Sequence, residues 1–274
     1  MNNLFKRVLV GAIGIPFALV VIYFGGWTFT IVISIIAAGT AYELIRVAKR
    51  IPIETTPWIA VIASAAMPVV SMLWGVSGMM IFFLLTVLVL SISSLLKSPA
   101  QGFAGIMLNV FTVVYSGILF SAMILLRNSG IENDVIRGGW LLLFAMAGVW
   151  IADSAAFFVG SYLGRHRMSP VLSPNKTYEG TICGILAAVA WGIWAPMMPE
   201  AFLGFADRAV LGAIIGVMAV LGDLTESMIK RAVNLKDSSN LFPGHGGMLD
   251  RFDSLLIVLP SVYVYLVLRG ILTM

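Results

Sequence analysis

Apolar runs long enough to cross a bilayer recur along this chain of 274 residues. Only 11% of the residues are charged, against about 25% in soluble domains, which excludes an ordinary soluble protein. We therefore expect an all-α, polytopic integral membrane protein with nine transmembrane helices. The expected spans are 8–24, 27–46, 57–74, 78–96, 103–126, 139–163, 178–198, 208–229 and 251–271.

The basic residues predict how these spans are oriented. With the N-terminus in the cytoplasm, 13 of the 17 Lys and Arg residues fall on the cytoplasmic side. Because cytoplasmic loops are enriched in Lys and Arg, nine spans with the N-terminus inside and the C-terminus outside are expected. The formal charge of +4 suits a protein beside anionic lipid better than a nucleic-acid-binding protein. We expect no nucleic-acid partner and a location in the plasma (inner) membrane.

The two halves of the chain differ in polarity. Residues 1–126 contain only two acids, Glu43 and Glu54, and we interpret them as an N-terminal transmembrane scaffold. Glu43 and Arg46 are three residues apart near a helix end, which favours a simple ion pair. Residues 127–274 hold the dense polar segments and form the expected catalytic half of one integrated membrane domain, with its site facing the cytoplasm.

One polar segment ends the eighth expected span. Asp223, Glu226, Ser227 and Lys230 have the spacing i, i+3, i+4 and i+7, which places them on one face of a helix. Carboxylates in such a place suit a hard cation, which prefers oxygen ligands. The alternative is an ordinary i, i+4 ion pair between Glu226 and Lys230.

A second polar segment begins the ninth expected span. Asp250 and Asp253 follow Gly246 and Gly247 directly. The carboxylates could cap the helix or, together with the pair on the preceding span, bind a cation. The glycines would allow backbone N–H groups to approach phosphate oxygens, unless they only form a flexible loop.

Two further segments carry polar groups. The run Ser173–Gly180 precedes the seventh span, and its hydroxyl groups and Lys176 could bind phosphate at a helix start. Equally, Ser173 or Thr177 could simply cap that helix. Asp153 lies inside the sixth span, where a carboxylate is usually functional; a buried hydrogen bond to a neighbouring helix is the alternative.

Together these segments resemble the CDP-diacylglycerol synthases, or phosphatidate cytidylyltransferases. The family pattern is matched at Ser227, Lys230-Arg231, Lys236-Asp237, Pro243–Gly247 and Asp250–Asp253, with the family's spacing. The Ser173–Gly180 run and Asp153-Ser154 match two further family segments. Ala155 departs from the pattern, since relatives commonly have glycine there.

The resemblance implies an enzyme of phospholipid biosynthesis that converts CTP and phosphatidic acid into CDP-diacylglycerol and pyrophosphate with Mg²⁺. It implies Asp223 and Asp250 as the main metal ligands and Glu226 and Asp253 as weaker ones, around two cations of which the second is unidentified. The implied catalytic residues are Lys230, Arg231, Lys236, Asp237, His245 and Arg251. The implied substrate-binding residues are Ser173, Lys176, Thr177, Glu179, Ser227, Gly246, Gly247 and Asp153.

Three alternatives stay open at this point. The acceptor could be another lipid, for a cytidylyltransferase or a CTP-dependent kinase. A secondary transporter could use Asp153 and Asp223 as ion sites, since such proteins place charged groups within the membrane. Small residues in the first span, such as Gly11, Gly14 and Ala18, could pack helices within the chain or in a homodimer.

Overall fold

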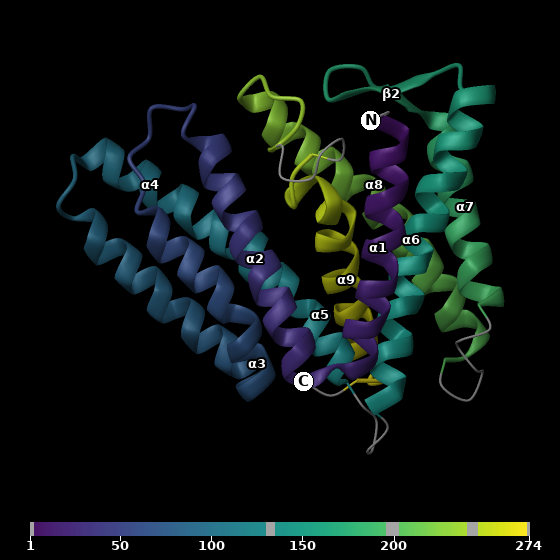
Figure 1. Ribbon diagram of the computed structural model, residues 1–274, viewed down its shortest axis with the longest axis horizontal. Coiled ribbons are helices and arrows are strands. Elements are labelled where there is room, and N and C mark those ends of the chain that lie inside the picture. Colours follow the sequence, from purple (N-terminus) through teal and green to yellow (C-terminus); the bar gives the residue numbers. More distant parts are fainter. Residues whose placement is uncertain (1–2, 130–134, 196–202, 240–245, 273–274) are drawn as a thin grey trace. The chain divides into compact units, whose positions relative to one another are not determined.

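Residues 3–129, 135–195, 203–239 and 246–272 are described by the computed structural model, and they are nearly all helical (Figure 1). The helices are α1 (Asn3–Phe24), α2 (Gly26–Ala48), α3 (Pro57–Ser94), α4 (Pro99–Thr112), the π-helix η1 (Val113–Ile118), α5 (Leu119–Asn128), α6 (Val135–Leu163), α7 (Tyr178–Trp194), α8 (Phe205–Ala232) and α9 (Leu249–Leu268). Within these ranges, the strands β1 (Arg167–Ser169) and β2 (Ser173–Thr177) pair antiparallel in one hairpin. The expected all-helical fold is therefore confirmed except for this hairpin.

Six helical stretches in the described residues are long and apolar enough to cross a membrane. They are α2, α3, the continuous run Pro99–Asn128, α6 from Gly138, α8 and α9. With 38 residues, α3 would extend about 57 Å at about 1.5 Å per residue, nearly twice the bilayer core of about 30 Å. Its backbone leaves the helical conformation at Gly75 (φ 61°), within the turn expected between the runs 57–74 and 78–96. Glycine tolerates this left-handed conformation because it has no Cβ.

The chain divides into two compact units. The first unit holds residues 1–128 and 232–252, and the second holds 129–231 and 253–273. The segment 232–252 thus groups with the N-terminal helices although it belongs to the C-terminal half of the sequence. The functional division into a scaffold (1–126) and a catalytic half (127–274) stays a prediction.

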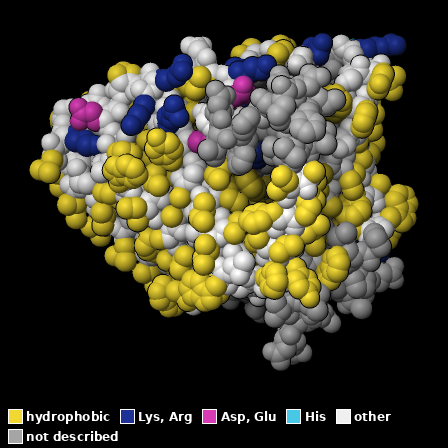
Figure 2. Space-filling view, viewed as in Figure 1, with side chains coloured by type: hydrophobic (Ala, Val, Ile, Leu, Met, Phe, Trp, Pro, Cys, Tyr) yellow, Lys and Arg dark blue, Asp and Glu magenta, His cyan; other side chains and the backbone are white. Residues whose placement is uncertain are grey.

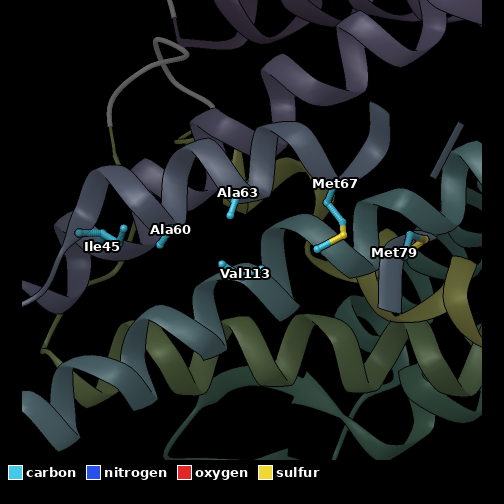
Figure 3. Packing of buried hydrophobic residues seen from close by; sticks show 6 residues of the cluster. All are labelled: Ile45, Ala60, Ala63, Met67, Met79 and Val113. Atoms are coloured by element: carbon cyan, nitrogen blue, oxygen red, sulfur yellow. The ribbon is translucent and has the colours of Figure 1, made fainter. Parts of the chain in front are cut away.

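A compact apolar core joins three helices of the first unit (Figure 3). Its buried members are Ile45, Ala60, Ala63, Met67, Met79 and Val113, contributed by α2, α3 and η1. The opposite surface of α3 is also apolar, with Leu84 and Leu88 more than half exposed. Over α2 and α3, hydrophobic side chains cover much of the visible surface (Figure 2). An exposed apolar surface of this extent fits contact with lipid.

Close helix packing shapes the second unit. A Cβ atom at Gly184 of α7 would lie 2.8 Å from the carbonyl oxygen of Ala152 on α6, and one at Gly216 of α8 would lie 2.8 Å from the Cα atom of Ile185 on α7. Small residues at helix interfaces are the usual means of close packing in membranes. These contacts hold together the helices that carry the polar side chains of this unit.

Candidate active site

Three carboxylates from two helices meet in the second unit. Asp223 and Glu226 lie near the C-terminal end of α8, and Asp253 lies near the start of α9. One oxygen from each of the three lies within 4.8 Å of the others. A Cβ at Gly222 would lie 2.7 Å from the carbonyl oxygen of Asp253 and from the Cα of Ser254, so glycine is what lets the two helices approach here.

This cluster could hold a divalent cation. An all-oxygen donor set suits a hard cation such as Mg²⁺ or Ca²⁺. Two oxygens bound to one Mg²⁺ at about 2.0–2.1 Å lie at most about 4.2 Å apart. The oxygens of the cluster all lie within 4.8 Å of one another, so at most about 0.6 Å of further approach is needed, a movement that side-chain rotation can supply.

Lys176 brings the hairpin to this cluster. Its Nζ lies 2.6 Å from Oδ2 of Asp223, and both side chains are only partly exposed. The other oxygen of Asp223 accepts a hydrogen bond from Ser227 Oγ at 3.3 Å. The structure therefore joins two segments that are almost fifty residues apart in sequence and that both carry predicted site residues.

Lys230 and Glu226 form the i, i+4 ion pair that the spacing allowed. Their Nζ and Oε2 atoms are 2.5 Å apart, and the side chain of Glu226 is only 2% exposed. A buried carboxylate is costly unless it is paired, so Lys230 stabilises Glu226 inside the cluster. The ion pair with Lys230 does not remove Glu226 from the acidic cluster, because one of its carboxylate oxygens still lies within 4.8 Å of an oxygen of each of the other two carboxylates.

The charges of this cluster do not cancel. Asp153 interacts electrostatically with Asp223 and with Lys176, and Asp253 interacts with Asp223 and with Lys230. Among these six described groups, four carboxylates (Asp153, Asp223, Glu226 and Asp253) lie near two ammonium groups, those of Lys176 and Lys230. With all six ionised, they carry a net charge of minus two, which one divalent cation would balance.

The hairpin that carries Lys176 is fixed at its base by two predicted substrate-binding residues. Thr177 is the N-cap of α7, and its Oγ1 accepts a hydrogen bond from Gly180 N at 3.2 Å. The carboxylate of Glu179 accepts bonds from the backbone N of His166 (3.3 Å) and lies 2.6 Å from its ring Nδ1. The capping role that the sequence left open for Thr177 is confirmed. Ser173 begins β2 and pairs in register with Ser169.

The Gly-rich loop before α9 lies in the first unit. Oδ2 of Asp250 accepts hydrogen bonds from Ser238 N (3.0 Å), Ser238 Oγ (2.6 Å) and Gly247 N (2.7 Å). Gly246 has φ 81°, a conformation that favours glycine. Asp250 thus has a clear contact role in this loop, whereas the acidic group of the second unit contains Asp253.

The remaining predicted site residues that the structure describes are not members of the acidic cluster. Lys236, Asp237 and Arg251 are exposed in the first unit, and Arg231 is partly buried in the second unit. His245 lies outside the described residues. Their roles stay predictions.

Glu43 has other partners than the sequence predicted. We expected an ion pair with Arg46, and this was wrong: Arg46 is exposed, whereas the Glu43 side chain is buried and accepts hydrogen bonds from Ser238, Ser239, Met248 and Leu249. A lone acid within an apolar run signals a binding or structural role, because burial of a carboxylate requires compensating donors. That signal was present in the sequence.

Comparison with known proteins gives a consistent result. Residues 5–269 match the model of the cytidylyltransferase family. The phosphatidate cytidylyltransferase of Bacillus subtilis is 30% identical over 98% of this chain and 99% of its own length. The protein of the same name from Synechocystis is 30% identical over 96% of both chains, and phosphatidate cytidylyltransferase 4, chloroplastic, of Arabidopsis thaliana is 31% identical over 97% of this chain and 74% of its own. The chain therefore belongs to the cytidylyltransferase family.

Proposed function

We propose that this protein is a phosphatidate cytidylyltransferase, which makes CDP-diacylglycerol and pyrophosphate from CTP and phosphatidic acid. Family membership and the shared name of its full-length relatives support the reaction. The observation that carries the proposal in the structure is the acidic cluster of α8 and α9 beside Lys176 and Lys230. Carboxylates with an excess of two negative charges, next to ammonium groups, suit a nucleotide phosphate bound with a divalent cation.

The proposed reaction requires that the two phosphates are positioned and that their negative charge is neutralised. A phosphate oxygen of phosphatidic acid attacks the α-phosphorus of CTP, a new P–O bond forms, and the bond to the β-phosphate oxygen breaks to release pyrophosphate. Because the attacking phosphate is already deprotonated at neutral pH, no strong general base is needed. Rate enhancement then comes from alignment of the two phosphates and from stabilisation of developing charge.

Asp223, Glu226 and Asp253 would hold the cation, for which we propose Mg²⁺. When bound, it would supply charge neutralisation at the phosphate oxygens. Asp250 stays a proposed ligand, including for a second cation of unknown identity. We rank it below Asp253, because three donors already occupy its Oδ2.

The basic residues are proposed to contact phosphates. Lys176 and Lys230 lie at the cluster itself, and an ammonium group has three N–H donors, so each could contact a carboxylate and a phosphate. Ser227 and Asp153 are proposed to orient Asp223 and Lys176. The family motif alone supports phosphate contacts for Arg231, Lys236, Arg251, Gly246 and Gly247, and a donor role for His245.

We further propose nine membrane spans with a cytoplasmic N-terminus and site, in the plasma membrane. The break in α3 at Gly75 supports two spans there, and the positive-inside distribution supports the orientation. We also propose a homodimer, for which the small residues of α1 are the only support.

The test is pyrophosphate release by the purified protein in lipid–detergent micelles. We expect release only with CTP, phosphatidic acid and Mg²⁺ together, and its loss on addition of a chelator. A panel of other lipid phosphates and polyprenols checks the acceptor. Release with another lipid but not with phosphatidic acid would change the proposed substrate. Ion-coupled uptake in vesicles without CTP would overturn the proposal that the protein is an enzyme.

A further inference from the structure

Glu43 of α2 is a buried carboxylate that holds the loop before α9. Its side chain lies within the first unit and is 4% exposed. Oε1 accepts hydrogen bonds from Ser239 Oγ (2.5 Å) and Met248 N (3.0 Å), and Oε2 accepts one from Leu249 N (2.9 Å). Donors from both described ends of the loop, 238–239 and 246–249, thus converge on one carboxylate.

Two of these donors belong to the start of α9. The first N–H groups of a helix have no acceptor within the helix and need one from outside. Negative charge is also favourable at a helix N-terminus. Glu43 supplies both the acceptor and the negative charge. It lies on α2, 205 residues before Met248 in the sequence, so it acts as a cap of α9 from outside that helix. The N–H donors in turn offset the cost of burying the carboxylate.

Ser238 and Gly247 connect Glu43 to Asp250. Ser238 Oγ lies 2.6 Å from Oδ2 of Asp250 and 3.2 Å from Oε2 of Glu43, and its single proton can serve one of the two at a time. A Cβ at Gly247 would overlap both Ser238 Oγ and the Glu43 carboxylate. This position therefore requires glycine, and both acids accept hydrogen bonds from the described loop residues.

We propose that Glu43 is a positioning residue for cytidylyl transfer. It sets the conformation of the described loop residues and thereby the place of Asp250 and of the Gly246 and Gly247 amide groups. The inference rests on the proposed function, because these loop groups belong to the motif that carries it. Glu43 itself contacts no substrate in this proposal, and it acts through the loop.

The test compares Glu43→Gln with Glu43→Asp, Ser239→Ala and Glu54→Gln. Glu54 is the matched control, since it is the other acid of residues 1–126 and is exposed. Each variant is assayed for kcat, for KM of CTP and phosphatidic acid, for the Mg²⁺ concentration at half-maximal rate, and for amide hydrogen exchange of residues 246–250.

For Glu43→Gln we expect a fall in kcat of about 10- to 100-fold, a higher Mg²⁺ requirement, and faster exchange at 246–250 while the other helices keep their protection. Glu43→Asp should recover part of the rate, Ser239→Ala should lose several-fold, and Glu54→Gln should match the wild type. Wild-type kinetics and Mg²⁺ dependence in Glu43→Gln would overturn the proposal.

Two further outcomes lead to different conclusions. If Glu43→Gln does not fold, Ser239→Ala decides, and wild-type turnover in that variant overturns the proposal. If the wild-type protein shows no transfer from CTP, the proposed function fails; amide exchange then tests the loop contact on its own, and unchanged exchange in Glu43→Gln overturns it.

Discussion

Nζ of Lys176 lies 2.6 Å from Oδ2 of Asp223, which ties the β-hairpin before α7 to the acidic end of α8. Both residues were predicted to belong to a site, but no sequence pattern indicated that they touch. The contact places the ammonium group of Lys176 beside the carboxylate of Asp223, which we propose as the leading metal ligand. It implies that the hairpin is part of the site and does more than connect α6 to α7.

Removal of this ammonium group should impair the enzyme. For Lys176→Met we expect kcat/KM for CTP to fall roughly 10- to 100-fold, because one of the two cations that offset four carboxylates is lost. Steady-state kinetics at saturating Mg²⁺ measure this. Asn175→Ala is the matched control, since Asn175 is the exposed neighbour on the same strand. Equal rates in the two variants would remove Lys176 from the site.

The approach of α8 to α9 depends on Gly222. In Gly222→Ala the new Cβ meets backbone atoms of Asp253 and Ser254, which cannot rotate away. We expect a loss of about 1–3 kcal/mol in stability, together with a strong loss of turnover as Asp223 and Asp253 separate.

Gly204→Ala provides the comparison, because a Cβ there would meet only Asp207 Oδ2, at the ordinary contact distance of 3.9 Å. It should keep wild-type turnover with at most a small loss of stability, since Gly204 precedes the first residue of α8, where alanine is a poorer N-cap than glycine. Thermal unfolding in detergent, read together with pyrophosphate release, measures both properties. Full activity in Gly222→Ala would show that the close approach of the helices is not needed.

The hairpin should lose its fixed base when Glu179 and His166 no longer interact. Glu179→Ala and His166→Ala each remove the 2.6 Å contact between the carboxylate and the ring, although Glu179→Ala also removes the backbone bond to residue 166. We expect faster proteolysis within 165–177 and a higher KM for CTP in both. In a double-mutant cycle the two effects should be non-additive, as for residues in direct contact. Additive effects would mean that the contact does not support the hairpin.

Much of this architecture follows from local sequence. The apolar runs predicted helices, and the polar spacing of Asp223 to Lys230 correctly placed these residues on one helix. The start of α9 at Leu249 likewise puts Asp250 and Asp253 in its first turns, as expected. The proposed ligands were chosen from these patterns, since a period of 3.6 residues is readable without any tertiary contact.

The tertiary contacts were not readable in this way. The short hairpin was missed, because Ser173-Pro174-Asn175-Lys176 lacks the apolar alternation of a strand and contains a proline, which argues against one. The contact of Lys176 with Asp223 and the cap that Glu43 provides for α9 both join residues far apart in the chain. Periodicity carries no information about such pairs, and for Glu43 a plausible local partner three residues away concealed the distant one.

The most direct test of the account compares Asp223→Asn with Asp207→Asn. Both residues lie on α8; Asp207 is near its start, where it accepts hydrogen bonds from Tyr265 Oη (2.6 Å) and Arg269 Nε (2.8 Å). We measure pyrophosphate release with CTP, phosphatidic acid and Mg²⁺, and confirm folding by thermal unfolding. The account predicts a loss of at least about 100-fold in Asp223→Asn with the fold retained, and near wild-type turnover in Asp207→Asn. Wild-type turnover in a folded Asp223→Asn variant would contradict the central claim that this carboxylate cluster is the catalytic cation site.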